Sequence, residues 1–213
     1  MQASCLFHVN MKCRFVCVTF LLFLFQAVPM VGIANEVSGD AAADVVFHFQ
    51  SVLLSIMRDA DGLRFKGRFE RLEPEVKQSH DLPDVARLTT GSYWRSLDKQ
   101  QQGSFTDTFT RLVIATYAHQ FNGYDGEAFK RKSVRSLKRG RFLVRTELVK
   151  SNGKSVHLDY VLHYREGRWS IINIIADGVS DLALKRAEYS HVLARDGFNA
   201  LVSMLERKIT QYK

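Results

Sequence analysis

Histidine and aspartate alternate along one short stretch of the chain, at His157, Asp159 and His163. If this stretch is a β-strand, these residues share one face, and an imidazole could lie beside a carboxylate and move protons to or from a substrate. The preceding strand pattern places Arg145 and Glu147 on the same face. Because such a row of charged side chains is typical of a solvated surface, we interpret this face as exposed and keep acid–base catalysis as the alternative.

Asp177 is a second candidate acid, because it ends a long apolar stretch and directly precedes Gly178. An Asp-Gly step also forms a turn, through local hydrogen bonds and the positive φ that glycine adopts freely. We therefore interpret Asp177 as a turn residue. The competing hypothesis is a small isomerase or hydrolase of α+β fold, with a cavity, that uses His157, Asp159 or Asp177 as its acid or base.

Other catalytic machinery is missing from the sequence, which contains no HExxH pair, no GxSxG elbow and no glycine-rich phosphate loop. The three cysteines, Cys5, Cys13 and Cys17, all lie near the amino terminus. Residues 18–213 therefore offer no thiol nucleophile and no cysteine ligand for a metal. The sequence predicts a protein that is not an enzyme and that needs no metal and no cofactor.

The amino-terminal segment is typical of a secretory signal peptide. Lys12 and Arg14 precede an apolar run, and small residues follow it up to Ala34. We expect cleavage after Ala34, which gives a signal peptide over residues 1–34 and a single domain over residues 35–213. A retained anchor helix is the alternative, although the run is shorter than the roughly 20 residues that a bilayer crossing needs.

Helices are predicted wherever apolar residues recur at spacings of three and four. The predicted helices cover residues 41–59, several short segments within 62–94, residues 98–121, residues 182–195 and a last stretch from Phe198. We expect Asp40 and Asp81 to cap helix starts and Asp196-Gly197 to break the last pair. Any functional site must therefore lie between these helices and the segment that separates residues 121 and 182.

Between the helices the apolar period changes from 3.6 to 2, which predicts strands. The predicted strands cover residues 127–137, 141–150, 156–164 and 169–176. Asn152-Gly153 and Glu166-Gly167 are hairpin signals, so the later strands form an antiparallel meander. The expected fold is α+β, with a twisted antiparallel sheet of about four strands and with helices before and after it that enclose an apolar cavity.

An apolar cavity between a helical layer and a curved sheet is the usual form of a ligand site. Acyl chains would suit it, since each buried CH₂ contributes about 0.8 kcal/mol. The net charge of +8, which includes Lys12 and Arg14 of the signal, fits anionic lipid headgroups or an acidic partner better than nucleic acid. The candidate lipid-binding residues are Val46, Phe49, Leu53, Ile56, Phe109, Leu112, Val113, Tyr117, Val144, Leu148, Tyr160, Leu162, Trp169, Ile171, Val179 and Leu182.

Several stretches of the chain resemble one known family. The stretches IADGVS at 175–180, RDGFNALVSML at 195–205 and the following ERKI are similar to the carboxyl-terminal part of the MlaC-type, or toluene-tolerance, periplasmic phospholipid-binding proteins. The stretches FERLEPEVKQSHDLPDVARL at 69–88 and RLVIATYAHQFNGYDGEAF at 111–129 resemble more particularly the HpnM branch, whose members are associated with hopanoid biosynthesis.

The resemblance implies a mixed α/β fold whose cavity takes phospholipid acyl chains and leaves the headgroup outside. It also implies a lipid shuttle in the periplasm, between an outer-membrane lipoprotein complex and an inner-membrane ABC transporter that bears an MCE-domain protein. For the HpnM branch the implied cargo is a hopanoid in place of phospholipid. We expect a monomer that binds no nucleic acid.

Overall fold

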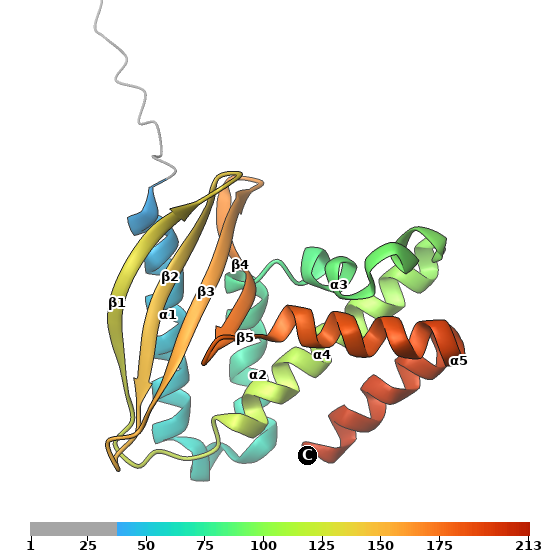
Figure 1. Cartoon of the computed structure of the whole chain (residues 1–213). Coiled ribbons are helices and arrows are strands. Elements are labelled where there is room, and N and C mark those ends of the chain that lie inside the picture. The colour runs from blue at the N-terminus through green and yellow to red at the C-terminus, as the bar shows by residue number, and fades with distance from the viewer. Residues whose placement is uncertain (1–37) are drawn as a thin grey trace, which may run out of the picture. The chain divides into compact units, whose positions relative to one another are not determined.

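The computed structural model describes residues 38–213, so the predicted signal peptide lies outside the described residues. Helices come first along this part of the chain, a sheet follows, and a long broken helix ends it (Figure 1). The elements are α1 (Gly39–Arg58), α2 (Ala60–Ser79), α3 (Leu82–Thr90), the 3₁₀ helix η1 (Gly91–Ser96), α4 (Lys99–Gln120), β1 (Ala128–Leu137), β2 (Arg141–Val149), β3 (Ser155–Arg165), β4 (Arg168–Ala176), β5 (Val179–Ser180) and α5 (Asp181–Gln211).

Within the described residues, the strands form one antiparallel sheet in chain order, β1 to β5. The prediction of an α+β fold is confirmed. The sheet has five strands instead of about four. The extra strand arises because both Asp177 and Gly178 adopt positive φ, 46° and 83°, which reverses the chain and pairs Val179 with Ala176.

A bulge interrupts β4 where it pairs with β3. Leu162 is opposite Ile171, but its neighbour Val161 is opposite Asn173, so Ile172 has no partner in the register. Such an extra residue bends the strand and shifts the alternation of its side chains by one position. Trp169 and Ile171 therefore face the helices before the bulge, and Ile174 faces them after it.

Helices cover one face of the sheet (Figure 1). α1 contacts β1, β2, β3 and β4, whereas α3 and α5 reach only the β4 side of the sheet. α2 packs on α1 and α4, and α4 packs in turn on α3 and α5. α1 is also the one described helix that is long and apolar enough, by length and composition, to cross a membrane. Its apolar side chains, however, lie in the core, and an ordinary core helix meets the same criteria.

Local hydrogen bonds set most of the helix boundaries. The Asp81 side chain accepts from the Asp84 amide at 3.0 Å and caps α3, as predicted. The prediction for the first helix is wrong, since Ser38 accepts from the Ala41 amide at 3.2 Å and Asp40 lies inside the first turn. The predicted break at Asp196-Gly197 is confirmed, because Gly197 has φ 82° and ψ −178° within α5.

The prediction of several short helices within residues 62–94 is confirmed, since α2 is kinked at Arg64 and is followed by α3 and η1. α2 has a non-helical residue only at Arg64 and continues past Pro74. Packing supports this helix, since its buried residues Leu72 and Val76 are fully enclosed by the core. Tertiary contacts thus stabilise a helix that its own sequence would interrupt.

We expect Arg68→Met to lower the melting temperature by roughly 6–12 °C, which corresponds to about 3 kcal/mol. Arg68 is buried, and its guanidinium donates to the carbonyl oxygens of Ala118 at 2.8 Å and Ala60 at 3.0 Å. Methionine fills a similar volume but leaves both carbonyls without this donor. Circular dichroism melts measure the change.

The matched control is Arg71→Met on the same helix. Arg71 is half-exposed and pairs with Asp59 at 2.6 Å, and a surface pair of this kind contributes about 0–1 kcal/mol. Equal melting temperatures for the two variants would show that Arg68 is not the stabilising contact between α2 and α4.

Candidate functional site

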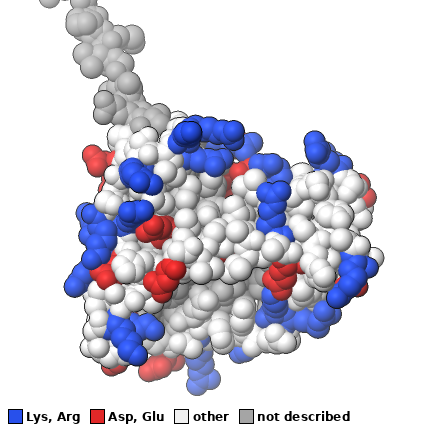
Figure 2. All heavy atoms as spheres, viewed as in Figure 1, with Lys and Arg blue, Asp and Glu red and all other residues white. Residues whose placement is uncertain are grey.

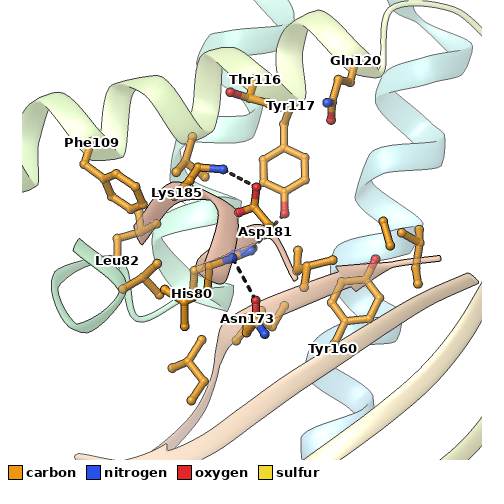
Figure 3. A pocket seen from close by; sticks show the side chains of 18 of the residues that line it. His80, Leu82, Phe109, Thr116, Tyr117, Gln120, Tyr160, Asn173, Asp181 and Lys185 are labelled. Carbon is orange, nitrogen blue, oxygen red and sulfur yellow. Dashed lines mark hydrogen bonds and ion pairs between the residues drawn. The ribbon is translucent and has the colours of Figure 1, made fainter. Parts of the chain in front are cut away.

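A pocket of about 230 Å³ lies between α4, the start of α5 and the β4 side of the sheet (Figure 3). Most of its lining is apolar. The apolar lining residues are Leu82, Val85, Phe109, Val113, Phe121, Leu158, Ile171, Ile172, Ile174, Ala176 and Leu182. They come from α3, α4, α5, β3 and β4 and from the residues next to them, so the pocket exists only when the helical layer closes on the sheet.

Asn173 joins the sheet to the helix that closes the pocket. Its Oδ1 accepts hydrogen bonds from the Leu182 amide and from the Ser180 hydroxyl, both at 3.1 Å. The Ser180 Oγ accepts in turn from the Ala183 amide at 3.1 Å and caps the start of α5. These bonds fix the first turn of α5 beside β4 and place Leu182 in the pocket wall.

A chain of hydrogen bonds sets which nitrogen of His80 carries the proton and where the Tyr117 hydroxyl donates. The Ser79 hydroxyl donates its proton to the Glu75 carbonyl at 2.6 Å, so Ser79 Oγ accepts from His80 Nδ1 at 2.9 Å. His80 Nε2 is then the unprotonated nitrogen and accepts from the Tyr117 hydroxyl at 3.1 Å. In Figure 3, Tyr117 extends from α4 toward His80. The Tyr117 oxygen therefore offers the pocket only acceptor lone pairs.

Burial keeps the polar groups of the pocket neutral. Desolvation lowers the pKa of His80 to about 4, raises the pKa of Tyr117 well above its usual value and raises the pKa of Tyr160 to about 12. Among the lining residues the charged side chains are Asp181 and Lys185, which pair with each other. The pocket is thus apolar, with a neutral polar part, and suits an apolar ligand better than a charged one.

Because His80 is neutral in the folded protein, we expect the free energy of unfolding to depend on pH. Its pKa is about 4 in the folded protein and about 6.5 when exposed. The unfolded chain therefore binds a proton below pH 6.5 that the folded protein does not bind, and stability falls as the pH drops from 6.5 to 4. We expect this residue to account for about 3 kcal/mol of the loss across that window.

His80→Gln isolates the effect of His80, because glutamine keeps a polar side chain but does not titrate. The free energy of unfolding, measured by urea titration at pH 7 and pH 4, should fall less with acid in this variant than in the parent protein. An identical pH dependence in both proteins would mean that His80 already titrates normally in the folded state.

The structure brings together six of the candidate lipid-binding residues around this pocket. They are Phe109, Val113, Tyr117, Tyr160, Ile171 and Leu182. Eight others are buried in the core and do not line the pocket, namely Val46, Phe49, Leu53, Ile56, Leu112, Val144, Leu162 and Trp169. Leu148 is half-buried near the end of β2, and Val179 is 52% exposed on β5.

The position of α1 explains this division. α1 lies against the sheet and fills the space over β1 and β2, so Phe49 on α1 and Val144 on β2 have no exposed surface. The β3–β4 side, under α4 and α5, keeps open space. Amphipathic periodicity identifies an inward face but does not tell whether protein or a ligand covers it.

The enzyme hypothesis is not supported by the positions of its residues. His157 and Asp177 lie 3.5 Å apart, but their side chains are 67% and 58% exposed, and neither lines the pocket. Asp177 Oδ1 accepts from the His157 amide at 2.8 Å and so serves the turn. Asp159 pairs with Arg145 at 3.3 Å on the same outer face. The face is solvated at His157, as the sequence indicated, but the side chains of Asp159 and His163 are only 23% and 14% exposed.

In the described part of the chain, the cluster most similar to a metal site consists of Asp81, Asp84 and His163. Each of its carboxylates already has partners. Asp81 caps α3 and is hydrogen-bonded to His163 Nε2 at 3.0 Å. Asp84 accepts two hydrogen bonds from Arg87. We interpret the cluster as the link between β3 and α3.

Sequence reasoning did not select several polar residues of the pocket. They are His80, Thr116, Gln120, Asn173, Asp181 and Lys185. His80 is 37 positions from its partner Tyr117, and no spacing rule links two such residues. The polar Asn173 within an apolar strand was the one available signal, because a polar residue in a buried strand needs a hydrogen-bond partner.

The chain is similar to one known protein family and to several of its members. A family model described as MlaC protein matches residues 49–207. The intermembrane phospholipid transport system binding protein MlaC of Haemophilus influenzae is 25% identical over 210 residues, which span 95% of this chain and 96% of that protein. The toluene tolerance protein ttg2D of Pseudomonas putida is 21% identical over 182 residues, or 83% of this chain and 82% of that protein.

A solved structure has the same fold. It is the phospholipid-binding protein from Ralstonia solanacearum in complex with a phospholipid, with a TM-score of 0.71 and 22% sequence identity. The match covers 80% of this chain and 98% of that chain. The arrangement of helices around the sheet is therefore shared along almost the whole length of that protein.

Proposed function

Because this chain belongs to the MlaC family, we propose that it is a lipid carrier that binds acyl chains in the pocket between α4, α5 and the sheet. The observation that carries the proposal is the pocket itself, which is lined by apolar side chains and by polar groups that burial keeps neutral. Burial of an acyl chain in such a pocket contributes about 0.8 kcal/mol of binding free energy per CH₂, and the chain needs no specific polar contact.

Phospholipid is the cargo that the comparisons support best. The relative from Haemophilus influenzae is described as a binding protein of a phospholipid transport system, and the structural neighbour holds a phospholipid. A hopanoid is the second candidate, because residues 69–88 and 111–129 resemble the HpnM branch. A hopanoid has a rigid fused-ring body, so the same pocket would need a different shape to accept it.

Loading requires the pocket to widen or to hold only part of the lipid. Its volume of about 230 Å³ is below the roughly 300–1,000 Å³ of sites that enclose a whole ligand. The headgroup then stays outside the apolar pocket, where water can solvate it.

We also propose how the carrier works in the cell. Residues 1–34 direct export and are removed, residues 35–213 form one lipid-binding domain, and the mature protein is a periplasmic monomer. It exchanges lipid with an outer-membrane lipoprotein complex and with the MCE-domain protein of an inner-membrane ABC transporter. In this proposal the protein is a carrier, not an enzyme, and needs no cofactor.

Organic extraction of the purified exported protein, followed by mass spectrometry, tests this function. We expect lipid in amounts comparable to the protein, and the mass distinguishes phospholipid from hopanoid. The emptied protein should take up the same lipid from vesicles. A protein that is purified empty and takes up neither lipid class would disprove the proposal.

A further inference from the structure

A second hollow, of about 380 Å³, lies where α3, η1 and α5 meet. We call it the arginine groove, and it is lined by Arg87, Leu88, Gly91, Ser92, Trp94, Arg95 and Arg186. Three of these residues are arginines, and none is acidic. Figure 2 shows Lys and Arg side chains spread over one face of the molecule, with fewer Asp and Glu among them. The groove gathers three arginines in one concave place.

Gly91 leaves space beside it for the guanidinium of Arg186. A Cβ added to Gly91 would lie 3.3 Å from both Nε and Nη2 of Arg186, so the guanidinium packs directly on the Gly91 backbone. Gly91 has a φ of 60°, ends α3 and leaves room for this contact. Arg186 is an exposed residue, so its donors can reach a ligand in the arginine groove.

The charge of the arginine groove is only partly compensated. Arg87 pairs with Asp84 at 2.6 Å. Among the described residues, neither Arg95 nor Arg186 forms an ion pair with a carboxylate. Guanidinium groups gathered around one hollow repel each other, and an anion placed between them removes this repulsion. Because the planar fork of arginine matches the oxygens of a phosphate, phosphate is the anion that this set suits best.

The arginine groove and the pocket share two helices. On α5, Leu182 and Lys185 line the pocket and the next residue, Arg186, lines the groove. On α3, Val85 lines the pocket and Leu88 lines the groove. Three residues of a helix rise only about 4.5 Å. A lipid with its chains in the pocket would therefore have its headgroup within reach of the arginine groove.

We propose that the arginine groove binds a phosphate group, and that the lipid held in the neighbouring pocket supplies it. The second half of this inference rests on the proposed function, whereas the first half does not. Phosphate binding by the arginine groove would give the carrier a preference for a phosphate-bearing lipid over a neutral lipid of the same chain length. Phospholipid would then be selected over a hopanoid that lacks phosphate.

The first test uses phosphate without lipid. The exported protein, freed of lipid by detergent exchange, is titrated with inorganic phosphate and with glycerol 3-phosphate, and sodium chloride at equal ionic strength is the reference. We expect the Nε–Hε NMR signals of Arg95 and Arg186 to shift with both phosphates and not with chloride. If all three salts act alike, the arginine groove is not a phosphate site.

The second test compares two soluble lipids with identical chains, dioctanoyl phosphatidylglycerol and dioctanoylglycerol. The double variant Arg95→Gln with Arg186→Gln should bind the phospholipid at least about tenfold more weakly, because charge-assisted bonds are lost. Its affinity for dioctanoylglycerol should not change. Arg207→Gln, an exposed arginine on α5, is the matched control and should alter neither affinity. Arg95→Gln alone serves if the double variant fails to fold.

The outcomes separate the two halves of the inference. Phosphate binding with an unchanged affinity for the phospholipid would identify a free anion as the ligand and overturn the headgroup assignment. Equal weakening for both lipids would also overturn it. If the parent protein binds neither lipid, the proposed carrier function fails, and the phosphate titration still decides whether the arginine groove is an anion site.

Discussion

Val113→Asp should abolish lipid loading and leave the protein folded. Val113 lies on α4, is only partly buried and lines the pocket, so an aspartate there reaches the space that an acyl chain would fill. A carboxylate beside an acyl chain either remains charged in an apolar place or takes up a proton, and both cost free energy. We expect the lipid that co-purifies with the protein to fall by about tenfold or more.

Val179→Asp is the matched control, since it makes the same change at a residue that the sequence also favoured. Val179 is 52% exposed on β5 and does not line the pocket. This variant should carry as much lipid as the parent protein. Mass spectrometry of extracts measures the loading, and circular dichroism confirms the fold. If Val113→Asp retained its lipid, the pocket under α4 would not be the lipid site.

Leu162→Asp should unfold the protein, although the sequence pattern placed Leu162 at the lipid. Its side chain has no exposed surface and lies in the core between β3 and the helices. An unpaired carboxylate in such a place costs several kcal/mol at least, against a total stability of about 5–15 kcal/mol for a typical domain. We expect no cooperative thermal transition, or a melting temperature lower by more than about 10 °C.

Val134→Asp provides the comparison for this effect within the same sheet. Val134 lies on β1 and is 39% exposed, so its replacement should change the unfolding free energy by no more than about 0.5 kcal/mol. Thermal denaturation of both variants checks the prediction. A folded Leu162→Asp protein with a normal melting temperature and no lipid would instead place Leu162 in the cavity wall.

The sequence alone determined most of the elements and their order, because their causes are local. The capping box at Asp98 and Gln101 starts α4 where the pattern predicted, and the alternation of Val144 with its neighbours gave the inner face of β2. Hydrogen bonds of caps and turns join residues a few positions apart, and the apolar period follows from helix and strand geometry. Such features can be read from one sequence.

The sequence did not determine which inward-facing residues meet a ligand. Phe49 and Phe109 both belong to apolar helix faces, yet Phe49 packs within the core and Phe109 lines the pocket. The difference depends on how far α1 extends over the sheet and on the bulge at Ile172, which bends β4. Both are products of packing between distant segments.

The polar chemistry of the molecule also depends on tertiary structure. His157 and Asp177 were the most suggestive residues in the sequence, but the turn uses them on an exposed face. His80, which no motif marks, meets Tyr117 in the pocket, and Arg186 meets Gly91 in the arginine groove. The sequence therefore determined the fold class and the likeness to a lipid-carrier family. Only tertiary packing decided where the apolar space remains and which polar groups border it, because both depend on contacts between residues far apart in the chain.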